Sequence, residues 1–153
     1  MLTKKAKYAL TAILNLARKH EDAPTRISEL AQEENIPQKF LEAILLELKK
    51  HGFLHSKKGK GGGYMLRKSP EEISMGDIIR AIDGPLAPVP CVSQSAYQKC
   101  SECKDERTCG IRITMKDVRD AMADVLDNTT IADVLRRVEE AEKAKQIELV
   151  KIS

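Results

Sequence analysis

The first fifty residues carry their apolar side chains at the spacing of an α-helix. Over residues 3–19 these side chains recur every three or four positions, which predicts a helix that packs against a core. Loop-forming residues follow over 21–24. A shorter helix is expected next, with Thr25 or Ser28 as its cap. The apolar residues on the two predicted faces are Ala6, Leu10, Ile13, Leu14, Ala17, Ile27, Leu30 and Ala31.

Asn35 and Pro37 predict where this helix ends and another begins. Asparagine tolerates the left-handed backbone conformation that ends a helix, and proline suits the first turn of a new one. Two short helices joined by such a tight turn form a helix-turn-helix. The new helix is expected to end near 51–52 and to bury Phe40, Leu41, Ile44, Leu45 and Leu48.

The pattern then changes from helical to alternating. Residues 53–56 predict a short strand, 57–63 a turn and 64–66 the returning strand. Residues 74–83 predict another short helix, whose apolar residues are Met75, Ile78, Ile79 and Ile82. The expected fold class is therefore mainly α with a small β-hairpin wing, and residues 1–84 are interpreted as a winged helix-turn-helix domain.

The second half begins with a proline-broken loop, residues 85–110, which holds all four cysteines. Apolar side chains then recur at steps of 4, 3, 4 and 3, which is the spacing of a heptad seam. The seam predicts a dimerisation helix over 111–127, and residues 128–153 are expected to hold a last helix and a charged tail. The seam residues are Ile111, Met115, Val118, Met122 and Val125.

Charge is unevenly distributed along the chain. Residues 1–70 hold 14 Lys and Arg against 7 Asp and Glu, whereas residues 71–153 hold 12 against 16. A basic first half is the expected footprint of a protein that contacts phosphates, and a solvated surface is the alternative interpretation.

The predicted helix-turn-helix and hairpin supply candidate DNA-binding residues. A helix that enters the major groove presents its first turns to the base edges, and Gln38, Lys39 and Glu42 occupy those turns. Glutamine can pair with adenine, and glutamate accepts from the cytosine amino group, so these side chains can discriminate sequence. The hairpin turn over 57–63 holds three lysines and four glycines, which combine positive charge with a backbone able to approach a groove closely. Its candidates are Lys57, Lys58, Lys60 and Tyr64.

The four cysteines follow the pattern Cys91-x8-Cys100-x2-Cys103-x5-Cys109. Four thiolates suit either a tetrahedral zinc ion or an iron–sulfur cluster, and their spacing does not separate the two. A zinc ribbon usually has two close cysteine pairs, whereas this loop has one, Cys100 and Cys103. The uneven spacing favours a partly open site that acts as a sensor over a metal site that only stabilises the fold. The remaining alternative is that the cysteines bind no metal or cluster.

Enzymes and membrane proteins are not expected. No Ser-His-Asp arrangement is indicated, and His20, His51 and His55 form no metal motif. No apolar run approaches the length of a membrane span, and the N-terminus leads directly into a helical pattern without a signal-peptide core. We therefore expect a cytoplasmic protein without membrane contacts.

Five segments carry a resemblance to known proteins: KYAL at 7–10, ISELA at 27–31, FLE at 40–42, GKGGGY at 59–64 and IIRAID at 78–83. Together they resemble the bacterial winged-helix transcriptional regulators that include the iron–sulfur cluster regulator IscR and the nitric-oxide sensor NsrR. The resemblance extends from Met1 to about Arg137. It implies a homodimer in which the helix over 111–127 crosses to its partner, and a palindromic DNA operator.

The resemblance also implies roles for single residues. Glu42 stands where the family uses a glutamate for base discrimination, and Lys58 stands where the family often has an arginine at the wing tip. The substitution at the wing keeps the charge but loses the planar fork of arginine.

For the cofactor, the resemblance implies an iron–sulfur cluster held by three cysteines, matched best by Cys91, Cys103 and Cys109. A [2Fe–2S] cluster is favoured, with [4Fe–4S] and zinc as alternatives. Arg112 stands where IscR-type proteins have a histidine, so the fourth ligand is expected to be Cys100 or a residue outside the loop.

The sequence thus predicts a repressor whose operator affinity is set by a cluster that senses iron–sulfur status, oxygen or nitric oxide. One alternative keeps DNA binding and replaces the cluster by zinc or by a thiol redox switch, for which a Cys100–Cys103 disulfide would be the indicator. The other is a protein-interaction adaptor without DNA binding, against which the basic hairpin argues.

Overall fold

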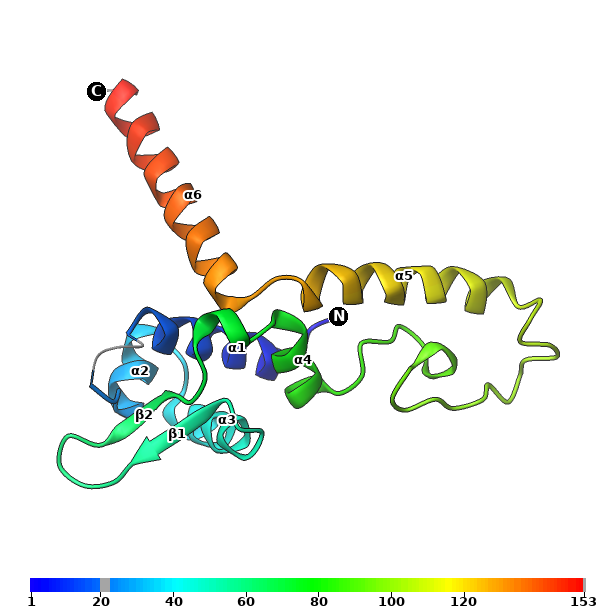
Figure 1. Cartoon of the computed structure of the whole chain (residues 1–153), viewed down its shortest axis with the longest axis horizontal. Helices are drawn as coiled ribbons and strands as arrows, with labels where there is room; N and C mark the ends of the chain where they lie inside the picture. Colours follow the sequence, from blue (N-terminus) through cyan, green and yellow to red (C-terminus); the bar gives the residue numbers. More distant parts are fainter. Residues whose placement is uncertain (20–22, 153) are drawn as a thin grey trace.

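The computed structural model describes residues 1–19 and 23–152. Its elements, in chain order, are α1 (Lys4–Arg18), α2 (Ile27–Glu33), α3 (Gln38–Lys50), β1 (Leu54–Lys57), β2 (Gly63–Leu66), the 3-10 turn η1 (Pro70–Glu72), α4 (Met75–Asp83), the 3-10 turn η2 (Pro90–Val92), α5 (Gly110–Asp127) and α6 (Ile131–Ile152). The elements from α1 to α4 gather into one body, called the head below, and α5 and α6 project from it in different directions (Figure 1). His20 lies outside the described residues, and so do residues 21 and 22 of the loop expected over 21–24.

The core of the head lies where α1 packs against α3 and α4. The apolar faces expected for these helices supply it, since Ile13, Leu41, Ile44, Leu45 and Leu48 are all almost completely inaccessible to solvent. Ile131, at the start of α6, is also fully buried in this core. The base of α6 is therefore part of the head, although the rest of the helix is not.

Two details of the helix-turn-helix differ from expectation. Phe40 is 44% exposed rather than buried, because it lies at the edge of the apolar face of α3 and packs its ring edge-on against Tyr8. The residue before α2 is Arg26, which makes no side-chain cap, so neither Thr25 nor Ser28 caps this helix. The stop at Asn35 is confirmed by its φ of 51°, and Pro37 stands one residue before α3 rather than inside its first turn.

The hairpin is antiparallel and is tied to the segment before α2. Ser56 pairs with Tyr64 across the two strands. On its other side Tyr64 exchanges backbone hydrogen bonds with Thr25, with N–O distances of 2.9 and 2.8 Å. Gly63 allows this contact, because its φ is 153° and a Cβ there would lie 2.2 Å from the carbonyl oxygen of Thr25. The wing thus has a firm base against the head.

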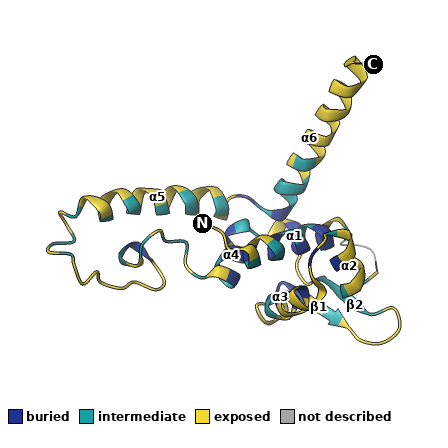
Figure 2. Cartoon of the chain, turned by 180° about the vertical axis from the view of Figure 1, so that it is seen from behind, coloured by how far each residue is buried: buried dark blue, intermediate teal, exposed yellow. Residues whose placement is uncertain are grey.

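The two projecting helices leave most of their surface open (Figure 2). In the part of the chain that the structure describes, α5 buries none of its side chains. The start of α6 is capped by Thr130, whose hydroxyl accepts from the Asp133 N–H at 3.1 Å, and residues 139–152 are exposed throughout. Within residues 1–19 and 23–152, none of the helices has both the length and the apolar composition needed to cross a membrane.

We expect Leu45→Ala to lower the free energy of unfolding by about 2–5 kcal/mol, because it removes buried methyl groups and leaves a cavity. Leu45 is 0% exposed, whereas its neighbour Leu46 is 48% exposed. Leu46→Ala is therefore a matched control and should change stability by no more than about 0.5 kcal/mol. Urea denaturation followed by circular dichroism measures both, and equal losses in the two variants would contradict the packing described here.

Candidate functional site

The N-terminal half of α3 presents the three residues expected to read bases. Gln38, Lys39 and Glu42 are all exposed, and Gln38 Nε2 donates to Glu42 Oε1 at 3.4 Å. They lie away from the buried stripe that contains Leu41 and Leu45. The first turn of α3 carries no acidic residue. The unpaired N–H groups and the positive end of the helix dipole are therefore not neutralised by a carboxylate within that turn.

The wing presents positive charge on a tight glycine turn. Lys57, Lys58 and Lys60 are exposed, and no carboxylate within residues 1–19 and 23–152 forms an ion pair with them. The turn closes where Gly62 N–H donates to the Gly59 carbonyl at 3.0 Å. Tyr64 is half-buried against the core, so it contributes to the base of the wing rather than to its tip.

The structure brings all four cysteines to one cavity. This cavity, called the cysteine pocket below, has a volume of about 410 Å³ and is lined by Cys91, Cys100, Cys103 and Cys109 together with Glu106 and Arg112. It lies between the loop and the start of α5, where the chain in Figure 1 turns from green to yellow. Cys100 is exposed, and the other three thiols are partly buried.

Two of the thiols have different proton affinities. Cys109 immediately precedes α5, and the backbone N–H of Arg112, the neighbouring Cys103 thiol and the backbone N–H of Ile111 lower the pKa of Cys109. Burial and the adjacent Cys109 raise the pKa of the Cys103 thiol. Cys109 therefore influences the Cys103 thiol more strongly than Cys100 does, although Cys100 is closer to it in sequence.

The cysteine pocket is not arranged as a closed metal site. Among the residues described, no three His, Cys, Asp or Glu side chains lie close enough together to hold a metal ion. The Nε of Arg112 is buried in the same region and has no hydrogen-bond partner within the described chain. The four sulfurs thus share one cavity without converging on one point.

The seam residues of α5 lie on an open helix. Ile111 is 69% exposed and Val125 61%, Val118 is exposed to a lesser extent, and Met115 and Met122 are half-buried. Ile113, which is outside the heptad spacing, is also 50% exposed.

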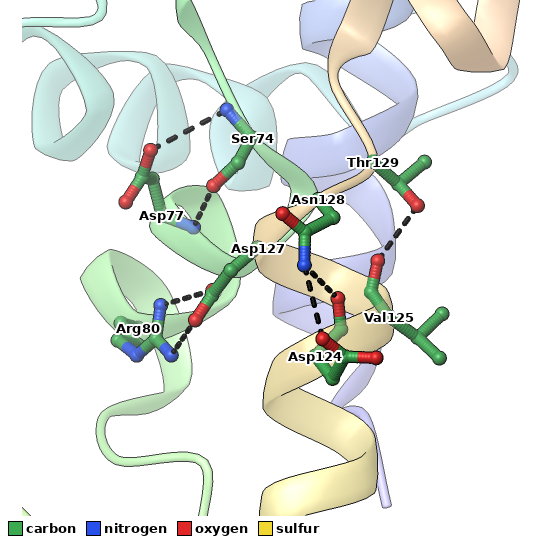
Figure 3. A network of polar contacts seen from close by, with 8 residues as sticks. All are labelled: Ser74, Asp77, Arg80, Asp124, Val125, Asp127, Asn128 and Thr129. Carbon is green, nitrogen blue, oxygen red and sulfur yellow. Dashed lines mark hydrogen bonds and ion pairs between the residues drawn. The ribbon is translucent and has the colours of Figure 1, made fainter.

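Helix α5 makes two further contacts that the sequence pattern did not identify, one from its end to the head and one from its middle to the loop. Arg80 on α4 and Asp127 at the end of α5 form an ion pair (Figure 3). Arg119 on α5 donates through Nη1 to the carbonyl of Val92, next to Cys91. Periodicity within a segment could not reveal these contacts, because their partners are 47 and 27 residues apart.

Comparison with known proteins agrees with this architecture. The model of the Rrf2 family, described as "Iron-dependent Transcriptional regulator", matches residues 2–137. An rrf2-like HTH-type transcriptional regulator of Rhodobacter capsulatus is 44% identical over 138 residues, covering 88% of this chain and 92% of the relative. CymR of Bacillus subtilis is 36% identical (87% and 88% covered), and IscR of Erwinia tasmaniensis is 28% identical (90% and 80% covered).

Solved structures show the same fold. The chain matches CymR, "the Global Cysteine Regulator of B. subtilis", with a TM-score of 0.73, 34% identity and coverage of 88% and 95%. IscR of T. potens matches with a TM-score of 0.73 and 27% identity, and the match covers 92% of this chain and 90% of that one. The oxidized form of Staphylococcus aureus CymR matches with a TM-score of 0.65 and 34% identity, and the match covers 88% of this chain and 94% of that one. These matches confirm the mainly helical winged fold and the resemblance derived from the sequence, and the relatives are transcriptional regulators rather than enzymes. The chain belongs to the Rrf2 family of helix-turn-helix transcriptional regulators, in which DNA binding is the shared activity.

Proposed function

We propose that this chain is a homodimeric repressor whose affinity for a palindromic operator depends on an iron–sulfur cluster in the cysteine pocket. The observation that carries the proposal is the position of that pocket. All four thiols line one cavity at the start of α5, and the far end of the same helix is joined to the head. A change in the pocket therefore acts on a rigid element that reaches the DNA-binding part of the molecule.

The DNA contacts divide between α3 and the wing. Gln38, Lys39 and Glu42 read base edges in the major groove, since they are exposed on the first turns of α3. The lysines of the wing neutralise phosphates and set the overall affinity. A two-fold symmetric dimer presents two such heads, so the operator has matching half-sites.

The dimer forms through α5. An exposed helix with a seam of Ile, Met and Val is costly to leave in water, and the α5 of a second copy offers the same seam in return. In this proposal residues 1–84 bind DNA, 85–110 hold the cluster, 111–127 form the dimer contact and 128–153 form the last helix and tail.

The residues of the cysteine pocket fit a cluster in donor type and in charge. Cys91, Cys103 and Cys109 are the proposed ligands, with Cys100 as the candidate fourth. Arg112 adds a buried N–H without a partner, which suits the negative charge of thiolate-bound iron and sulfide. When bound, the cluster supplies reactivity toward oxygen and nitric oxide. The protein contributes the movement of loop 91–109 that draws the thiols together, since they do not yet converge.

Anaerobic purification tests the cofactor. We expect visible charge-transfer absorption, with iron and acid-labile sulfide in equal amounts, and selection from random duplexes should recover a palindrome. Removal of the cluster by a chelator should change the affinity for that palindrome. A colourless protein without iron would overturn the proposal, and stoichiometric zinc would favour a structural site instead.

A thiol switch in the same DNA-binding regulator is the second candidate, favoured by the thiols of Cys103 and Cys109, which line one cavity and influence each other's pKa. Here hydrogen peroxide is reduced to two waters while the two thiols lose two electrons and two protons and form a disulfide. An oxidized form of Staphylococcus aureus CymR, a relative of this chain, has been solved. Peptide mapping after peroxide treatment should find the Cys103–Cys109 bond in an iron-free protein, and its absence would leave the cluster as the candidate.

A further inference from the structure

The end of α5 is held against the head by a bidentate ion pair (Figure 3). Arg80 Nη1 donates to Asp127 Oδ1 at 2.6 Å, and Arg80 Nη2 donates to Asp127 Oδ2 at 2.8 Å. Two parallel bonds between planar groups fix an orientation as well as a distance. We call this pair the clasp.

Backbone hydrogen bonds beside the clasp hold the connection between α5 and α6. Met75 N–H donates to the Thr129 carbonyl at 2.9 Å, and Ile131 N–H donates to the Ile73 carbonyl at 2.9 Å. Within the connection, Asn128 Nδ2 donates to the Asp124 carbonyl at 2.8 Å and so satisfies one of the last carbonyls of α5. The backbone therefore anchors the point where α5 ends, directly beside the clasp.

Gly76 leaves room beside the clasp for the Asp127 carboxylate. It lies one turn before Arg80 on α4, and a Cβ there would lie 2.0 Å from Asp127 Oδ1 and 3.0 Å from Arg80 Nη1. Glycine is otherwise an unfavourable residue in a helix. Its absent side chain is the space that the Asp127 carboxylate occupies.

The same helix is also attached to the cysteine-containing loop. The carbonyl of Val92, which is buried and follows Cys91, accepts from Arg119 Nη1. Arg119 lies eight positions before Asp127 on α5. Thus α5 has one arginine contact to the loop and one arginine contact to the head, with a continuous helix between them.

We infer that the clasp of Arg80 and Asp127, with the space left by Gly76, is a positioning device that fixes the angle between α5 and the DNA-binding head and so sets the spacing of the two heads of the dimer. The inference rests on the proposed function, because it needs a dimer that binds two half-sites. Arg80 and Asp127 touch neither DNA nor cofactor in this scheme. They act through the direction of α5.

Half-site spacing gives a direct test. Wild-type protein and the variants Asp127→Asn, Arg80→Lys and Gly76→Ala are measured on duplexes from the selected palindrome whose two half-sites are moved apart or together by one or two base pairs. Wild type should prefer one spacing strongly. The clasp variants should lose about ten-fold or more of that preference, within the usual range of coupling between sites. Their affinity for a single half-site should stay unchanged, because α3 and the wing are intact.

The variants separate a positioning role from a stabilising one. Arg80→Lys keeps the charge but loses the planar fork, and Gly76→Ala keeps both partners but displaces the carboxylate. Arg136→Gln is the matched control, since it removes two ion pairs within α6, to Asp133 and Glu140, that do not involve α5. Light scattering and iron content should be the same for all five proteins.

Clasp variants that keep the wild-type spacing preference would overturn the inference, as would an equal loss in Arg136→Gln. Wild-type protein that binds no duplex would overturn the proposed function, and the inference with it. A variant that loses half-site binding as well would show that the clasp merely stabilises the head. Gly76→Ala retains both Arg80 and Asp127, so it shows whether a loss of half-site binding in another variant comes only from poor folding of that variant.

Discussion

Replacing Lys57, Lys58 and Lys60 together by alanine is expected to weaken duplex binding by about a hundred-fold and to reduce the slope of log affinity against log salt by about 3. The three ammonium groups are exposed on the wing and have no carboxylate partner within the described residues, so they are available to phosphates. Each contact releases about one counterion from the DNA, which explains the change in slope. Fluorescence anisotropy over a salt series measures both quantities.

A second triple variant controls for net charge. Lys143, Lys145 and Lys151 lie on the exposed outer part of α6, far along the chain from the wing, and their replacement removes the same charge. That variant should keep nearly the wild-type slope. If the two triple variants weaken binding equally, the effect comes from the overall field of the protein and the wing is not a local phosphate-binding element.

Cys109→Ala is expected to lower the iron content per chain by at least about ten-fold, because the loss of a cluster ligand exceeds the 10–100-fold cost of losing an outer-shell partner. Cys109 stands at the start of α5, where the backbone N–H groups of Arg112 and Ile111 favour its thiolate. Because Cys109 is the residue directly before α5, its backbone position is set by that helix. Iron and sulfide analysis of anaerobically purified protein measures the effect.

Cys100→Ala is the comparison that decides the ligand set. Cys100 is the exposed member of the four and the candidate fourth ligand, so its loss should shift the absorption spectrum while most of the iron remains. Equal loss in both variants would make Cys100 an essential ligand. Full retention of iron in Cys109→Ala would exclude Cys109 as a ligand.

The two predictions concern the two regions that α5 connects, the DNA-binding head and the cysteine pocket. The wing variants change how strongly a head binds DNA, whereas the cysteine variants change what occupies the pocket beside α5. The clasp between Arg80 and Asp127 connects the two regions, because it joins the end of α5 to α4 in the head. Each proposed variant alters only one of these three parts.

The sequence by itself determined the elements that depend on local spacing. The apolar faces of α1 and α3, the stop at Asn35 with its φ of 51° and the glycine turn of the hairpin follow from periodicity and backbone preference, and the structure confirms them. The basic surface of the wing and the family were accessible for the same reason, since both are properties of contiguous residues.

Tertiary structure alone decided the contacts between distant segments. Phe40 continues the apolar pattern of α3 but lies at its edge beside Tyr8, so periodicity alone assigned it to the core. The gathering of all four cysteines around one cavity depends on how the loop turns back to the start of α5. The clasp joins residues 47 positions apart, and the space for it is a missing Cβ at Gly76. Spacing along a chain records which face of an element is apolar, whereas the partner of that face is set by packing between elements.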